Sequence, residues 1–292
     1  MSGSLTWRQV GSTTSEGNDA ITTPKVTTKY IGNGDRWYIH EGSGNQVPGV
    51  SAIKGMLPAS ALSNWFKKFT AEYCVDHIDV IKTLAESDRE GAINLVKGAT
   101  DRHSKTAANK GTDVHAHAEQ LMRDKIAGVK STFRASKEEL RYLRNLARFI
   151  LEFEVEPVMV ETTVWSQEHE YAGTFDLLCR LKGYDGLQIV DYKSGQSGVY
   201  PDAGIQQTGY RWADSYVDEE GNFQPMPEVT GAFGMWLRPD GWALYPLRTD
   251  EVMWDTFIHL REAYKYTVEI APTVVSKPVN SAPLKKKWRG NR

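Results

Sequence analysis

Three runs of β-branched and aromatic residues follow one another at short intervals in the middle of the chain. They span residues 158–166, 171–181 and 187–194, and turn residues separate them. Only residues 182–186 separate the second run from the third, and 182–185 have the length of a hairpin loop. This spacing predicts consecutive strands, with the second and third runs paired as an antiparallel hairpin.

The rest of the chain is predicted to be mainly helical. Apolar residues recur every three or four positions over 59–77 and 136–152, and Ser136 with Glu139 gives the second of these helices a capping box. Further helices are expected over about 80–97, 111–126, 202–216 and 249–266, and further strands within 29–40 and 229–247. The fold class is therefore α/β, with a central mixed β-sheet flanked by helices and an N-terminal helical extension.

Composition argues against several classes of protein. Cys74 and Cys179 are the two cysteines and lie in no CxxC spacing, so a disulfide framework, a zinc ribbon and an iron–sulfur cluster are not expected. The sequence has no G-x-x-x-x-G-K-[ST] loop, so we expect neither an ATPase motor nor ATP as a cofactor. No apolar run approaches the length of a membrane span, so no membrane partner and a cytoplasmic location are expected.

The charge is balanced overall but uneven along the chain. The sequence has 35 basic and 37 acidic residues, for a net charge of −2. The last twelve residues, 281–292, hold five Lys and Arg and no acid. A polyanion responds to such a local patch and not to the net charge, so nucleic acid remains open as a partner.

Two carboxylates fall opposite each other in the predicted hairpin. If Leu181 pairs with Gly186, then Asp176 faces Asp191 between otherwise apolar strand residues. Like charges at directly opposed positions repel, so a cation between them is favoured, and a hard divalent cation prefers oxygen ligands. A register shifted by two residues would leave the two acids as diagonal neighbours.

A lysine completes this group. Lys193 lies two residues beyond Asp191, so the two-residue period of a strand places both side chains on one face. Two carboxylates and an ammonium group that converge on one end of a hairpin suit metal-assisted hydrolysis of a phosphodiester. In such a site the carboxylates hold the metal and the lysine orients the nucleophile.

The motifs around these residues resemble those of a known family. Asp176 followed by Asp191-Tyr192-Lys193 resembles the acid, acid and lysine core of PD-(D/E)XK nucleases, and Gly173-Thr174-Phe175-Asp176 stands in place of the Pro-Asp form, as in the RecB-like branch. Gly111-Thr112-Asp113-Val114-His115 is similar to the upstream GxxxH motif of that branch. Gln206 and Tyr210 match its downstream QxxxY motif. The match covers residues 111–216, about a third of the chain.

The resemblance assigns roles to individual residues. It implies a restriction-endonuclease-like core with Mg²⁺ as cofactor, for which Mn²⁺ can substitute. Lys193 would position the attacking water, and Glu161 is a candidate ligand or water-positioning base. The implied metal ligands are His115, Asp176, Asp191 and the backbone carbonyl of Tyr192. Gln206 and Tyr210 would contact the substrate.

The function that the resemblance implies is a metal-dependent DNA exonuclease of phage DNA recombination, replication or repair, located in the bacterial host cytoplasm. The resemblance also allows a strand-annealing recombination protein as a partner, and it allows the chain to form a homo-oligomer. Three alternatives stay open. They are a structure-dependent endonuclease with the same site, a catalytically inactive DNA-binding protein of the same fold, and a non-nucleolytic metalloenzyme.

The expected organisation is a single nuclease domain between two mobile ends. Residues 1–27 form a flexible lead-in, residues 28–271 the domain, and residues 272–292 a basic mobile tail. Within the domain we expect an N-terminal strand and helical part, the core motifs, and a hairpin with a helix, over residues 28–110, 111–216 and 217–271.

Some residues near the motifs have ordinary explanations. His117 is expected to be solvated, because two positions along a helix turn it away from His115. Glu119, one turn after His115, can point toward the site but is better explained as a surface acid that pairs along the helix. Trp65, Trp212 and Trp254 fall on apolar stripes and are expected in the core.

Overall fold

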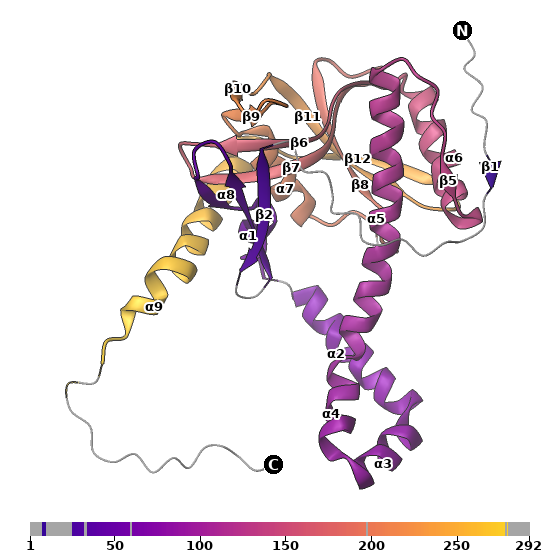
Figure 1. Cartoon of the computed structure of the whole chain (residues 1–292), viewed down its shortest axis with the longest axis vertical. Helices are drawn as coiled ribbons and strands as arrows, with labels where there is room; N and C mark the ends of the chain where they lie inside the picture. The colour runs from indigo at the N-terminus through magenta and orange to yellow at the C-terminus, as the bar shows by residue number, and fades with distance from the viewer. Residues whose placement is uncertain are drawn as a thin grey trace.

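A seven-stranded mixed sheet lies at the centre of the protein (Figure 1). The computed structural model describes residues 8–9, 25–31, 34–58, 60–196, 198–277 and 279. The strand order is β10-β9-β6-β7-β8-β11-β12. Neighbouring strands are antiparallel except β8 and β11, which run parallel. The strands are β6 (Glu156–Ser166), β7 (Tyr171–Arg180), β8 (Leu187–Lys193), β9 (Ser215–Val217), β10 (Phe223–Pro225), β11 (Val229–Leu237) and β12 (Trp242–Leu247).

The three β-rich runs of the sequence form the middle of this sheet, which confirms the predicted mixed sheet. The parallel pair needs a crossover, and the chain makes it by leaving β8 through α7 (Asp202–Arg211) and returning as β11. The helix expected over 202–216 is too long, because α7 ends at Arg211 and β9 begins at Ser215. The expected hairpin at 229–247 is formed by β11 and β12.

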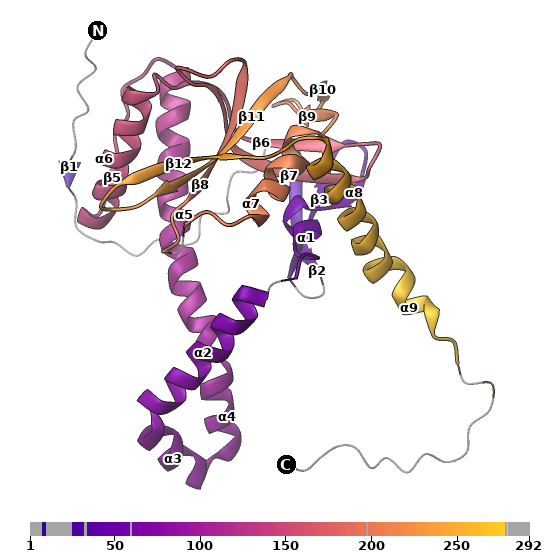
Figure 2. The same ribbon diagram turned by 180° about the vertical axis from the view of Figure 1, so that it is seen from behind.

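Helices cover both faces of the sheet, each over its own apolar core. On one face α5 (Ala99–Ile126) and α6 (Lys137–Glu152) bury residues such as Met122 and Phe149; we call this the α5/α6 core. On the other face α1 (Val50–Lys54), α7 and α8 (Glu251–Lys265) bury residues such as Ile205 and Phe257; we call this the α7/α8 core. Figures 1 and 2 show the two groups of helices on either side of the sheet.

Helix α6 begins as its sequence predicts. The Ser136 hydroxyl accepts a hydrogen bond from the backbone N–H of Glu139, and the Glu139 carboxylate accepts one from the N–H of Ser136. This capping box satisfies two backbone donors at the start of the helix.

Smaller sheets flank the central one. The strands expected within 29–40 are β2 (Val26–Ile31) and β3 (Asp35–His40), and β4 (Gln46–Pro48) joins them in a three-stranded sheet. Within the expected lead-in, β1 (Arg8–Gln9) pairs with β5 (Arg134–Ala135), while residues 1–7 and 10–24 lie outside the described residues. Most of the expected tail, residues 278 and 280–292, also lies outside them.

An arm of helices projects from the body and forms the predicted N-terminal extension (Figures 1 and 2). It consists of α2 (Ser60–Asp76), α3 (Ile78–Ser87), α4 (Arg89–Lys97) and the first half of α5. The single helix expected over 80–97 is two helices, because Asp88 interrupts it and caps α4 by accepting from the Gly91 N–H. Helix α5 begins at Ala99 and not near residue 111 as expected. In the part of the chain that the structure describes, no helix is long and apolar enough to span a membrane.

The three tryptophans expected in the core are all partly accessible. Trp65 lies on the arm with 36% of its surface exposed and stacks on Phe69, with ring centroids 5.2 Å apart. It is not a core residue, because the thin arm offers it too little cover. Trp212 and Trp254 are half-buried and stack on each other with centroids 5.6 Å apart.

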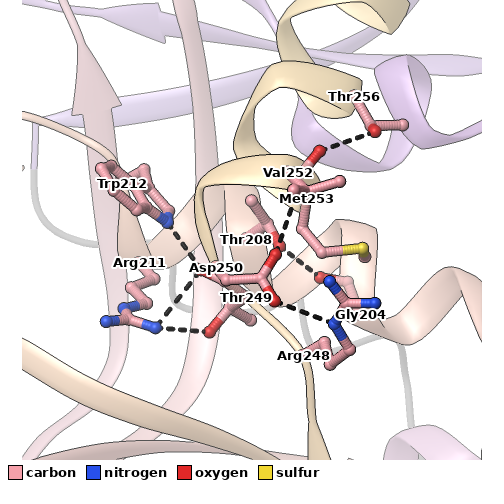
Figure 3. A network of polar contacts seen from close by, with 10 residues as sticks. All are labelled: Gly204, Thr208, Arg211, Trp212, Arg248, Thr249, Asp250, Val252, Met253 and Thr256. Atoms are coloured by element: carbon pink, nitrogen blue, oxygen red, sulfur yellow. Dashed lines mark hydrogen bonds and ion pairs between the residues drawn. The ribbon is translucent and has the colours of Figure 1, made fainter.

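Polar contacts join the end of α7 to the start of α8 (Figure 3). The Trp212 indole N–H donates to the Thr249 carbonyl at 2.8 Å, and Arg211 donates to the Thr249 hydroxyl at 2.8 Å. Asp250 caps α8 by accepting from the Met253 N–H. These contacts fix α7, which carries Gln206 and Tyr210, against the body. Beyond α8 the chain continues through η1 (Tyr266–Ile270) and α9 (Ala271–Val274).

Candidate metal centre

The pleat of two central strands changes face at one point. Val160 of β6 and Leu177 of β7 lie in the α5/α6 core, whereas Val164 and Phe175, an even number of positions away, lie in the α7/α8 core. Regular alternation would place residues of the same parity on one face. Each strand therefore changes face between these positions, in the interval that holds Glu161 on β6 and Asp176 on β7.

A left-handed backbone accompanies this change on β6. Glu161 has φ +47°, a conformation that non-glycine residues rarely adopt in a strand. The strands pair on either side of it, as Val160↔Leu177 and Thr162↔Phe175. Local irregularities of this kind redirect side chains and occur beside functional sites.

Three side chains converge here from three elements. A nitrogen of His115 on α5 and one carboxylate oxygen each from Glu161 and Asp176 all lie within 4.8 Å of one another. The His115 Nδ1 is 3.6 Å from Asp176 Oδ2. Asp176 Oδ2 also accepts a hydrogen bond from the backbone N–H of Tyr192 at 2.7 Å. The Tyr192 ring meets the His115 ring edge-on, with centroids 5.9 Å apart.

The donor set fits a hard or borderline divalent cation. Carboxylate oxygens with an imidazole nitrogen are ligands that Mg²⁺, Mn²⁺ and Zn²⁺ use. Burial raises the pKa of Glu161 to about 9, with further increases from the neighbouring Asp176 and Glu119, while Arg123 and Arg36 act in the opposite direction. Two carboxylates forced together in a half-buried place are costly to ionise, and a cation between them removes that cost.

Asp191 and Lys193 lie beside this cluster, at the C-terminal end of β8. The predicted hairpin register is the observed one, with Leu177↔Val190 and Cys179↔Gln188. Asp191 keeps the regular alternation of β8 and shares its face with Ile189 of the α7/α8 core. Its Oδ2 is 2.7 Å from Lys193 Nζ, which agrees with their expected position on one face.

Asp176 has an acid on each neighbouring strand. Within the three-residue cluster its carboxylate meets that of Glu161 on β6, and Asp191 follows Val190, the strand partner of Leu177, on β8. The charge of Asp176 acts on the pKa of Asp191. Burial first, and then repulsion by Asp176, raises the pKa of Asp191 to about 6, against the lowering effect of Lys193.

Lys193 begins a short chain of polar contacts toward α7. Its Nζ donates to Gln206 Oε1 at 3.3 Å, and Gln206 Nε2 donates to the Tyr210 hydroxyl at 3.0 Å. Burial lowers the pKa of Lys193, but Asp191, Asp176 and Asp202 together raise it more, so the net shift is upward and the ammonium form persists. The structure thus brings together the residues of the QxxxY and D-x-K motifs.

Gly173 lets α7 approach this closely. A Cβ atom at Gly173 would lie 2.5 Å from Tyr210 Cε1 and 2.9 Å from Val50 Cγ2, so no larger residue fits without displacing the Tyr210 ring. Tyr210 is 4% exposed. The glycine of the Gly-Thr-Phe-Asp motif therefore has a packing role at the Tyr210 end of the polar chain.

The sequence interpretation misplaced one residue of α5 and missed another. His117 is not solvated: its side chain is 17% exposed and lies between α5 and α6, 3.9 Å from Glu139 and edge-on to Phe133. Glu119 does pair along the helix, with Arg123 at 2.8 Å. Arg123 was overlooked, although its spacing from His115 and Glu119 places all three on one helix face. The side chains of 111–113 lie outside the described residues.

Comparison with known proteins adds little to this geometry. No protein-family model and no curated protein matches the chain. An alkaline exonuclease (LHK-Exo) from Laribacter hongkongensis aligns with a TM-score of 0.31 and 12% identity, over 52% of this chain and 77% of that one. The structure of SSO0001 aligns with a TM-score of 0.28 and 14% identity. The alignment covers 44% of this chain and 58% of SSO0001. Scores this low carry no argument about fold or activity, so function must be argued from the site.

Proposed function

We propose that this protein is a metal-dependent nuclease that hydrolyses phosphodiester bonds of DNA. The observation that carries the proposal is the convergence of His115, Glu161 and Asp176 next to the Asp191–Lys193 pair. Three candidate ligands beside a half-buried, protonated lysine suit a reaction in which an oxyanion develops on phosphorus. The order of the motifs, similar to that of PD-(D/E)XK nucleases, supports the same reaction.

Each residue then has a definite task. His115, Glu161 and Asp176 hold the cation, with Asp191 and the Tyr192 carbonyl as further candidate ligands. Mg²⁺, or Mn²⁺ in its place, supplies a Lewis acid that withdraws charge from the phosphate and makes water more acidic. Lys193 orients the attacking water and stabilises the charge that develops on the phosphate.

Gln206 and Tyr210 fix the lysine. Gln206 accepts from Lys193 and donates to the Tyr210 hydroxyl, so α7 limits the positions open to the ammonium group. In an enzyme that works by orientation, a small displacement of such a group reduces the rate. By the resemblance of the QxxxY motif, the side chains of Gln206 and Tyr210 also contact the substrate strand.

We further propose that the enzyme acts from DNA ends, as an exonuclease of phage-type recombination, replication or repair. The resemblance of the motifs to RecB-like phage exonucleases supports this part. A structure-dependent endonuclease would use the same site and differs in one testable respect: it does not need an end.

The experiment combines linear and covalently closed circular duplex DNA in one reaction. Wild type is compared with Lys193→Ala and with Lys182→Ala, a control at an exposed lysine that pairs with Glu154 on the far end of the hairpin. Loss of linear DNA alone, with Mg²⁺ but not with EDTA, and only in the wild type and the control, supports the exonuclease. Cutting of the circle indicates the endonuclease. Intact DNA under every divalent metal overturns the proposal.

A further inference from the structure

One face of α5 carries more than a candidate metal ligand. His115, Glu119 and Arg123 are spaced four residues apart, so they follow one side of the helix toward β6. Arg123 Nε donates to Glu119 Oε1 at 2.8 Å, and Arg123 Nη2 donates to the backbone carbonyl of Val160 at 3.1 Å. The guanidinium group thus joins the helix to the strand at the residue that precedes Glu161.

This contact lies where β6 departs from regular geometry. Val160 is 4% exposed, and its carbonyl also accepts from the Thr162 hydroxyl at 3.3 Å. Donors from Arg123 and Thr162 therefore fix the peptide on the N-terminal side of Glu161, whose φ is +47°. A left-handed residue in a strand is unfavourable by itself and persists only where its surroundings hold it.

We propose that Arg123, oriented by Glu119, is a positioning residue of the metal centre. It holds the Val160 carbonyl so that the backbone turns at Glu161 and directs that carboxylate toward Asp176 and His115. This inference rests on the proposed function, because it assumes that the cluster binds a divalent cation. Groups that orient a metal ligand typically change metal affinity by about 10–100-fold when removed.

Simple electrostatics makes the opposite prediction. Arg123 is a cation close to the cluster, and its charge acts on Glu161. If that charge were its only influence, its removal would strengthen the binding of a second cation. The positioning role predicts weaker binding. The sign of the change therefore separates the two explanations.

The fold should tolerate the substitution. The Arg123 side chain is 46% exposed and that of Glu119 is 24% exposed, and we therefore expect the melting temperature to change little when the pair is removed. A loss of metal affinity at nearly unchanged melting temperature is thus the expected signature of positioning, and general damage to the protein would lower both.

The test is a double-mutant cycle on the full chain, with Mn²⁺ binding measured by calorimetry in the absence of DNA. Arg123→Gln is expected to weaken Mn²⁺ binding about tenfold. Because Arg123 acts through Glu161, the same change in a Glu161→Gln background is expected to alter the affinity less than about twofold. Arg144→Gln, at an exposed arginine on α6, is the matched control and leaves binding unchanged.

Arg123→Lys keeps the charge but loses the planar fork. Weaker Mn²⁺ binding in this variant supports positioning, and it repeats the test if Arg123→Gln does not fold. The inference is overturned if Arg123→Gln binds Mn²⁺ as tightly as wild type or more tightly, or if the tenfold loss persists without Glu161. A wild type that binds no Mn²⁺ overturns the metal centre and the proposed function as well. A wild type that binds Mn²⁺ and cleaves DNA while the cycle is additive overturns the positioning role alone.

Discussion

Replacing Glu161 with glutamine should make the metal-free protein more stable, and increasingly so as the pH rises. The unfolded chain ionises this glutamate near its ordinary pKa of 4.5, whereas burial and Asp176 raise the pKa of the folded carboxyl to about 9. Between these values the unfolded state binds fewer protons than the folded state. The stability of the wild type therefore falls with rising pH in this window, and Glu161→Gln removes this contribution.

The size of the effect follows from the window. Each pH unit between the two pKa values changes the free energy of unfolding by about 1.36 kcal/mol, so the step from pH 5.5 to pH 8 gives an upper limit of about 3.4 kcal/mol. The Glu161 carboxyl is half-buried and water reaches it. We therefore expect about half of this limit, on the order of 1.5–2 kcal/mol.

Urea unfolding in EDTA at pH 5.5 and pH 8 measures this difference for the wild type, Glu161→Gln and a control. Glu154→Gln is a suitable control, because Glu154 is an exposed acid that pairs with Lys182. The advantage of Glu161→Gln over wild type should grow between the two pH values, and that of the control should not. If this advantage stays constant or shrinks as the pH rises, burial and Asp176 do not raise the pKa of Glu161 in the folded protein, and our account of the metal centre is wrong.

Other substitutions test separate parts of the structure. Lys193→Ala should reduce the cleavage rate by about 100–1000-fold while the melting temperature stays within a few degrees, as measured by single-turnover assays and thermal unfolding. Gly173→Ala should destabilise the protein by about 1–3 kcal/mol in urea, because its Cβ meets Tyr210; Gly195→Ala, where nothing lies within 4 Å of the added Cβ, should change stability by less than about 1 kcal/mol. Ser136→Ala should cost about 1 kcal/mol in the same assay by removing the cap of α6. Mn²⁺ at about 100 times its Kd should stabilise the wild type by about 2.7 kcal/mol, read as a rise in melting temperature.

The sequence predicts best what local interactions determine. The short loop after β7 leaves one favourable way to pair the two strands, and the register deduced from it is the observed one. The Ser136 cap likewise fixes the start of α6. The same rule, applied to Asp88, would have divided the helix expected over 80–97, since an aspartate before a helical run is a common cap.

What the sequence could not predict depends on distant contacts. A left-handed glutamate in a strand has no local signal, because glutamate does not favour that backbone. Its conformation depends on a carbonyl held by Arg123, 37 residues earlier in the chain than Val160. An argument from strand alternation assumes that every strand keeps its pleat, and two of the three central strands do not.

The change of face in β6 and β7 matters because it lies where the metal-ligand cluster and the Asp191–Lys193 pair come together. At this change of face, Glu161 of β6 and Asp176 of β7 both meet His115 of α5. Because the change occurs next to β8, which stays regular, the α5 side and the α7 side of the sheet come within electrostatic reach. Asp176 and His115 both act on the pKa of Asp191, in opposite directions. Under the proposed function, a cation held by His115, Glu161 and Asp176 and the ammonium group of Lys193 would act on the same phosphate.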